Sequence, residues 1–195
     1  MNGLVSSLNQ FISYITLVEA GIGGAAIYSL YKPLAEQDHD RISSIVVAAK
    51  KSYRQAGYIF SAGIFILAVI YGFLSNAENV SFGTIFILTI ILGVNGCFDF
   101  FFVAGDRVLL TADQRNYIIS LATIINTVLR TLIICVMAAH HINILLLYGC
   151  AASLILIKAG IIVCYSRNNY LYINKNAYPD KSAMEKRWEV IYQQI

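Results

Sequence analysis

Charged residues are scarce in this sequence. Asp, Glu, Lys and Arg together make up only 13% of the 195 residues, whereas 58% of the residues are hydrophobic. In a soluble domain about a quarter of all residues are charged, so this chain lacks the polar surface that it would need to face water on all sides. The composition, with a mean hydropathy of +0.66, favours a bilayer environment. We expect no nucleic-acid partner.

Motifs for catalysis and for metal binding are also missing. The sequence contains no H-E-x-x-H, no G-x-S-x-G and no P-loop. The four cysteines stand alone in apolar runs, without the spacing of metal ligands or of a disulfide framework: Cys97, Cys135, Cys150 and Cys164. We therefore predict no metal site, no cofactor and no enzymatic activity, and we expect the cysteines to act as small buried apolar residues.

Long apolar runs account for most of the chain. Each run reaches or approaches the roughly 20 residues that a helix needs to cross the hydrocarbon of a bilayer. The predicted fold is an all-α, polytopic membrane bundle over residues 1–165, followed by a polar tail over 166–195. Its five expected transmembrane helices cover residues 8–31, 56–74, 83–105, 117–139 and 142–165.

The cations between these runs predict a sidedness. Of the 14 Lys and Arg residues, five lie in the 32–55 loop, two in the 106–116 loop and five in the tail, and the remaining two lie inside helices. The positive-inside rule therefore places both loops and the C-terminus in the cytoplasm. The N-terminus is then outside although residues 1–10 contain no Lys or Arg, so we expect that one preceding helix is missing from this chain.

The 32–55 loop is predicted to contain a basic amphipathic helix after Pro33, which should stop the first span. From Arg41 onward, apolar residues recur at helical spacing opposite a cluster of cations: Ile42, Ile45, Val46 and Ala49 opposite Lys50, Lys51 and Arg54. Such a helix suits an anionic inner leaflet, and a solvated connecting helix is the equally weighted alternative. Residues 182–195 repeat the pattern more weakly.

Four ionisable residues lie inside the predicted spans: Glu19, Asp99, Arg130 and Lys158. A charge at the centre of a membrane helix costs about 2.5–3.5 kcal/mol on insertion scales, so each should face protein or a water-filled cavity. Counted from the predicted inner ends, Glu19 and Arg130 lie roughly 18–20 Å deep and Asp99 and Lys158 about 10 Å deep. We therefore predict that Glu19 pairs with Arg130 and that Asp99 pairs with Lys158. Lys158 could instead extend to the inner interface.

The fourth predicted span carries a polar stripe along one face. Its members follow at helical spacing: Ser120, Thr123, Asn126, Thr127 and Arg130. A stripe of this length lines either a wet lumen or a hydrogen-bonded contact between helices, and the arginine favours the lumen.

The order of these features resembles a known family. LVEAGIGGAA at 17–26 leads into YKPLAEQDHDRI at 31–42 and AAKKSYR at 48–54, and later come VLLTADQRNY at 108–117 and AMEKRW at 183–188. Together they resemble the Wzx-type flippases of O-antigen and capsule assembly, in the superfamily of the MATE multidrug exporters. The resemblance covers spans two to six of the first of two six-helix lobes.

The resemblance implies a function in bacterial surface polysaccharide biosynthesis. A flippase of this type moves an undecaprenyl-diphosphate-linked oligosaccharide across the bacterial inner membrane by alternating access between its lobes. Arg130 and Lys158 would then meet the anionic substrate in the lumen, beside Asn126, Thr123 and Thr127. Glu19 and Asp99 would balance these cations or couple transport to H⁺ or Na⁺. Partners would include the missing second lobe or other membrane proteins of glycan assembly.

Two alternatives remain open at this point. One is a fragment of a MATE-like drug or ion exporter, for which a lumen with carboxylates alone would be expected. The other is a membrane scaffold for glycan-assembly enzymes that does not transport and uses the basic loop as its working surface.

Overall fold

The computed structural model describes residues 2–16, 20–74, 82–140, 143–174 and 177–180, and all regular structure in these ranges is helical. Four apolar helical stretches in the described ranges are long enough to cross a membrane: His39–Phe73, Phe82–Ala112, Asn116–Ala139 and Ile144–Asn169. The predicted all-α membrane bundle is therefore confirmed.

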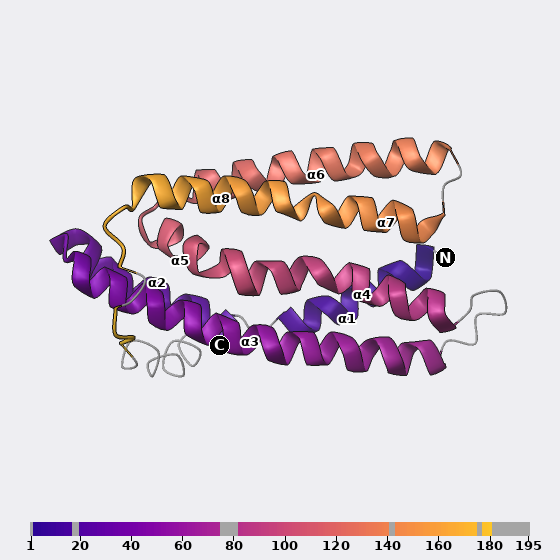
Figure 1. The fold of residues 1–195 in the computed structure, drawn as a ribbon, viewed down its shortest axis with the longest axis horizontal. Helices are drawn as coiled ribbons and strands as arrows, with labels where there is room; N and C mark the ends of the chain where they lie inside the picture. Colours follow the sequence, from indigo (N-terminus) through magenta and orange to yellow (C-terminus); the bar gives the residue numbers. More distant parts are fainter. Residues whose placement is uncertain (1, 17–19, 75–81, 141–142, 175–176, 181–195) are drawn as a thin grey trace.

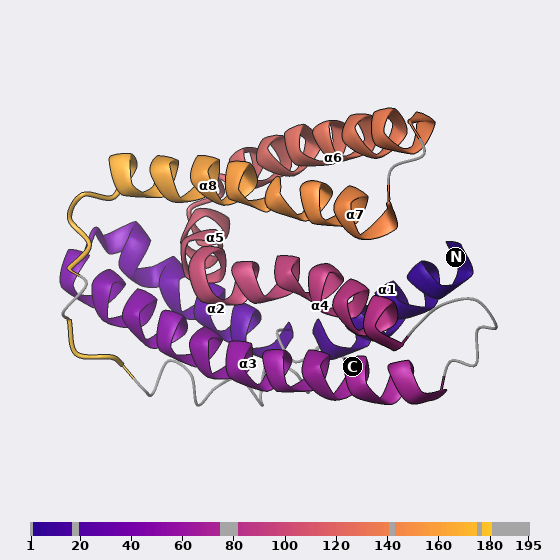
Figure 2. The same cartoon turned by 45° about the vertical axis from the view of Figure 1, so that its right-hand side comes forward.

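The helices pack in layers around a continuous apolar core. Figures 1 and 2 show α6, α7 and α8 along one side, α2 and α3 along the other, and α4 with α5 between them. The elements in chain order are α1 (Asn2–Thr16), α2 (Ala20–Glu36), α3 (His39–Leu74), α4 (Phe82–Phe98), the π-helix η2 (Asp99–Val103), α5 (Ala104–Ala112), α6 (Asn116–Ala139), α7 (Ile144–Ser153) and α8 (Ile155–Asn169).

The first predicted span corresponds to two shorter helices, α1 with 15 residues and α2 with 17. Glu19 belongs to residues 17–19, which lie outside the described part of the chain, so its predicted pairing with Arg130 stays a prediction. The expectation that Pro33 stops the helix is wrong, because α2 continues through Pro33 to Glu36. The chain turns after Glu36, where Gln37 has a left-handed φ of 57°.

The basic amphipathic segment forms a helix, but it does not offer its apolar face to a membrane surface. It is the first part of α3, which runs without interruption into the second predicted span. Ile42, Ile45, Val46 and Ala49 are all buried in the protein core, and α3 packs against α2 and α5. The interfacial-helix prediction is therefore wrong, since protein covers the face that lipid was expected to cover.

Two other predicted boundaries fall too early in the sequence. The third span continues through η2 and α5 to Ala112, so most of the predicted 106–116 loop is helical. The last span extends beyond residue 165 to Asn169, whereas the fourth, Asn116–Ala139, lies where it was predicted. Asp106 and Arg107 suggested a loop because they are charged, but both have partners inside the bundle. The predicted tail helix over 182–195 lies outside the described residues.

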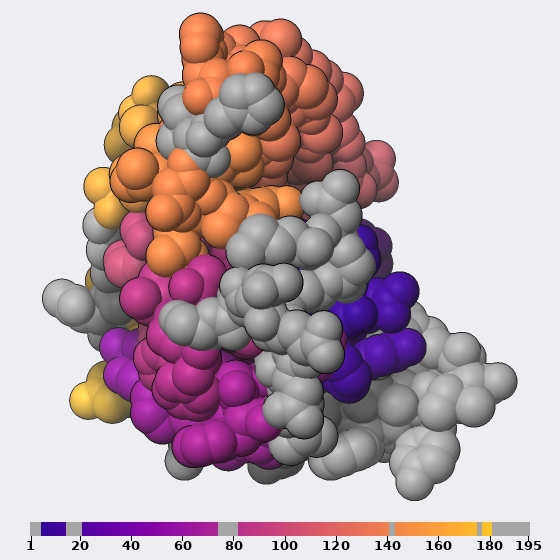
Figure 3. All heavy atoms as spheres, turned by 90° about the vertical axis from the view of Figure 1, so that its right-hand side faces the viewer, coloured from indigo at the N-terminus to yellow at the C-terminus, as the bar shows by residue number. Residues whose placement is uncertain are grey.

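Small residues allow the helices to approach closely. Gly96 of α4 lies against the ring of the fully buried Phe60 of α3, and Gly23 of α2 lies against the Tyr53 hydroxyl. Cys97 is half-buried beside Ser61, but the other three cysteines are exposed on the surface of this chain, contrary to expectation. Figure 3 views the end where α7 begins, with its orange atoms above the magenta atoms of α4 and the indigo atoms of α1.

Candidate functional site

Asp99 and Lys158 form the ion pair that the sequence predicted. Lys158 Nζ lies 3.2 Å from Asp99 Oδ1, and Arg107 Nη1 lies 3.3 Å from Asp99 Oδ2. The side chains of Lys158, Asp99 and Arg107 are only 16%, 19% and 25% exposed. Asp99 is the first residue of the π-helix η2, an irregularity that often marks functional positions in helices. One carboxylate therefore holds two cations inside the bundle.

Asp99 is also the first of three aspartates, spaced seven residues apart, that we call the acidic ladder: Asp99, Asp106 and Asp113. Each aspartate binds a side chain of α8 or of the segment that follows it. Asp99 accepts from Lys158, Asp106 Oδ1 accepts from Ser166 Oγ at 3.1 Å, and Asp113 accepts from the Tyr170 hydroxyl. The ladder therefore fastens the η2 and α5 segment to α8 along its length.

Asp99, Lys158 and Arg130 lie at two levels of the bundle. Asp99 is 13 residues from the end of α5 (112 − 99), Lys158 is 11 from the end of α8 (169 − 158) and Arg130 is 14 from the start of α6 (130 − 116). At a rise of about 1.5 Å per residue these depths are roughly 20, 17 and 21 Å. These helix ends are not level, because α6 begins beside the last turns of α8, where the Tyr117 hydroxyl lies 3.0 Å from the Tyr165 hydroxyl. Arg130 is 13 residues from Tyr117 (130 − 117) and Lys158 is seven from Tyr165 (165 − 158), so Arg130 lies roughly 9 Å further along the bundle, which agrees with the two predicted levels.

The polar stripe on α6 lies at the edge of its packing face. Asn126 and Arg130 are half-buried, whereas Ser120, Thr123 and Thr127 are exposed on this chain. The Thr123 hydroxyl donates to the Ile119 carbonyl of its own helix. The Asn126 Oδ1 atom is buried without a hydrogen-bond partner, and Arg130 makes no ion pair or hydrogen bond with the described residues. The structure thus leaves the two most polar members of the stripe available to another group.

A polar cluster holds the turn between α5 and α6 against the end of α8. Arg115 Nε lies 2.7 Å from Asp113 Oδ2, and Arg115 Nη1 donates to the Tyr165 hydroxyl at 3.0 Å. The Arg115 guanidinium also lies over the ring of Tyr170, which is buried. Burial has the largest effect on the pKa of the Tyr170 hydroxyl and raises it well above its ordinary value. The hydrogen bond to Asp113 raises this pKa further.

This shift predicts a loss of stability at alkaline pH. Because the pKa of Tyr170 is higher in the folded chain than in the unfolded chain, the unfolded chain loses this proton first as the pH rises above about 10. The contribution of Tyr170 is therefore complete below that pH and decreases above it. We expect the melting temperature in detergent to fall less steeply between pH 9.5 and 11 for Tyr170→Phe than for the wild type. Parallel curves for the two proteins would contradict this assignment.

Sequence reasoning identified the Asp99–Lys158 pair but missed Arg107 and the remainder of the ladder. Asp106 and Asp113 were assigned to a loop, where a seven-residue spacing has no structural meaning. In a continuous helix the same spacing brings residues to similar faces two turns apart. The repeat from Asp99 to Asp113 was therefore the signal that could have revealed both the longer helix and its contact with α8.

Comparison with known proteins does not assign this chain to a family. No protein-family model matches it, and neither curated proteins nor solved structures give a significant match. The resemblance to flippases therefore rests on the sequence patterns, and the function must be argued from the fold and from the charges that it contains.

Proposed function

We propose that this chain takes part in moving an anionic, lipid-linked oligosaccharide across a membrane. The observation that carries the proposal is the positive charge held inside a bundle of apolar helices. Lys158 and Arg107 both lie within ion-pair distance of the Asp99 carboxylate. Arg130 adds a positive charge further along the bundle, with no partner among the described residues.

Positive charge in this setting favours an anionic substrate. An unpaired cation inside a membrane helix is costly, and the cost falls when the cation faces water or an anion. A substrate that carries a diphosphate or acidic sugars would supply that anion during its passage. A cationic drug would be repelled by such a charge, so the exporter alternative is less consistent with Arg130.

The resemblance supplies the more specific parts of the proposal. It suggests an undecaprenyl-diphosphate carrier, a bacterial inner membrane and a second lobe that would complete the cavity. The positive-inside rule suggests that the end of the bundle carrying Lys50, Lys51 and Arg54 faces the cytoplasm. Arg130 and Asn126 would then face the second lobe or the lumen between the lobes.

The test is complementation of a bacterial strain that lacks its own oligosaccharide flippase. The chain would be expressed alone and together with a separately encoded second lobe of a Wzx-type flippase, and surface polysaccharide would be measured. We expect restoration in at least one arrangement. Arg130→Met should lower the restored amount at least tenfold, because it removes the cation without adding bulk.

The control variant is Arg41→Met, which removes an exposed cation near the start of α3. It should leave the restored amount of polysaccharide unchanged. If the wild-type chain inserts into the membrane in normal amount but restores no polysaccharide in either arrangement, the proposed function is wrong.

A further inference from the structure

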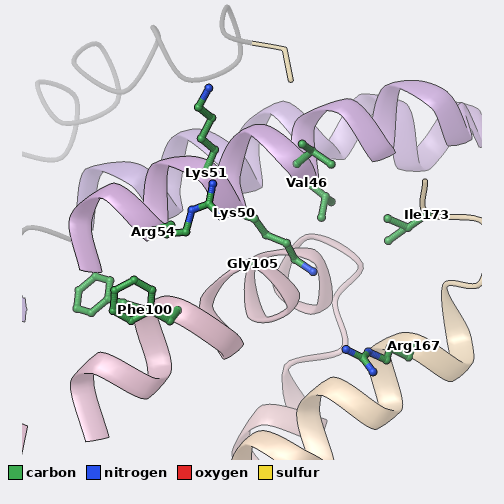
Figure 4. A pocket seen from close by; sticks show the side chains of 10 residues that line it. Val46, Lys50, Lys51, Arg54, Phe100, Gly105, Arg167 and Ile173 are labelled. Atoms are coloured by element: carbon green, nitrogen blue, oxygen red, sulfur yellow. The ribbon is translucent and has the colours of Figure 1, made fainter. Parts of the chain in front are cut away.

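A second cationic feature lies at the end of the bundle where α3 begins and α8 ends. There the structure has an open pocket of about 450 Å³, lined by residues of α3, η2, α5, α8 and the segment after α8. Four of the lining residues are cations, namely Lys50, Lys51, Arg54 and Arg167. Figure 4 shows Lys50 extending across Gly105, Lys51 pointing away from Lys50, and Arg167 reaching in from α8.

The pocket carries a large excess of positive charge. Lys50 is the only one of the four cations with a carboxylate partner in the described chain, since its Nζ lies 2.9 Å from Asp106 Oδ1. Lys51, Arg54 and Arg167 are exposed and make no ion pair or hydrogen bond with the described residues. Four cations and one carboxylate give a formal charge of +3 (4 − 1). Three of the cations thus remain available to an anion.

One wall of the pocket is apolar and continues along the outside of the bundle. Phe100 and Phe101 line the pocket, and the Phe101 ring lies 5.3 Å from the exposed ring of Tyr58. Tyr58 and Phe65 follow Arg54 at helical spacing and are 64% and 57% exposed. One face of α3 therefore changes from basic to apolar within about one turn, as at the boundary between lipid headgroups and acyl chains.

The size and charge of the pocket favour a phosphate ester. Arginine binds phosphate oxygens through two parallel hydrogen bonds, and lysine contributes a mobile positive charge. Basic pockets between membrane helices on the cytoplasmic side bind the headgroups of anionic lipids. A soluble phosphate compound would use the cations but would leave the adjoining apolar surface of Tyr58 and Phe65 unused.

We propose that this pocket binds the phosphate of an anionic phospholipid, with the acyl chains of the lipid lying against Tyr58 and Phe65. Lys51 and Arg54 attract the phosphate from the α3 wall of the pocket, and Arg167 attracts it from the α8 wall. Lys50 stays with Asp106 and Ser166 and keeps α3, α5 and α8 in place around the pocket. This site is separate from the charged level at Asp99 and does not depend on transport.

The test measures lipid binding by the full-length purified chain in nanodiscs of phosphatidylcholine that contain an increasing fraction of fluorescent phosphatidylglycerol. We expect saturable binding of phosphatidylglycerol and weak binding of a labelled phosphatidylcholine. Arg54→Gln with Arg167→Gln should weaken binding roughly 10- to 30-fold, because each cation near the surface contributes about a fivefold effect. Arg41→Gln, the matched control on α3 outside the pocket, should change it less than twofold.

A charge-preserving variant separates loss of binding from loss of fold. Arg54→Lys with Arg167→Lys should retain most of the binding, and the melting temperatures of all variants without phosphatidylglycerol should agree with that of the wild type. Equal binding of the two lipids, or an unchanged affinity in the double Gln variant, would overturn the proposal. Binding of glycerol phosphate or inorganic diphosphate as tight as that of the lipid would overturn the lipid as the source of the phosphate.

Discussion

Replacing Asp99 with Asn is expected to destabilise this protein strongly. The variant keeps the shape of the side chain but leaves Lys158 and Arg107 without their shared carboxylate. Removing one member of a buried ion pair costs about 3–5 kcal/mol, because the remaining charge is buried without compensation. For a chain of this length, the melting temperature in detergent should fall by roughly 10 °C.

Two further variants show whether the ion pair is responsible. Glu36→Gln removes a carboxylate from an exposed pair, in which Lys32 and Glu36 are 75% and 53% exposed, and it should change the melting temperature very little. Asp99→Asn combined with Lys158→Met removes one of the two cations that Asp99 binds and should recover part of the loss. If Asp99→Asn is no more harmful than Glu36→Gln, the cluster contributes nothing to stability.

The sequence predicted those features that depend on a single helix or on the high cost of a charge in a membrane. The boundaries of α6 followed from an apolar run with polar residues at both ends. The pairing of Asp99 with Lys158 followed from the expectation that an acid and a base buried at similar depth will find each other. Their common depth was predicted even though its value was underestimated.

The features that depend on contact between helices were not predictable from composition and periodicity. The apolar face of Ile42, Ile45 and Val46 has the same pattern whether lipid or protein covers it, and only the packing of α3 against α2 and α5 decides between them. In the same way, the charge of Asp106 suggests a loop residue in the sequence, and only the structure shows that Lys50 and Ser166 bind it inside the bundle. Charged residues near the end of an apolar run therefore do not by themselves mark the end of the helix.

The close approach of α3 and α4 predicts the second large effect, for Gly96→Ala. An added Cβ at residue 96 would lie 2.4 Å from Cζ and 2.7 Å from Cε1 of Phe60, whose side chain is fully buried. The ring cannot move aside without disturbing Phe100, whose ring centroid lies 5.1 Å away beside the ion cluster. Overpacking of this kind costs about 1–3 kcal/mol, so the melting temperature should fall by several degrees.

Gly160→Ala is the matched control, because a Cβ at this position of α8 would meet no atom within 4 Å. The same chemical change should therefore be neutral or slightly stabilising there, since alanine is the better helix former. A compensating variant, Gly96→Ala with Phe60→Leu, should recover part of the lost stability, because the shorter leucine side chain relieves the clash with the added methyl group. If Gly96→Ala and Gly160→Ala have the same melting temperature, the two helices do not approach each other as closely as the contact between Gly96 and Phe60 requires.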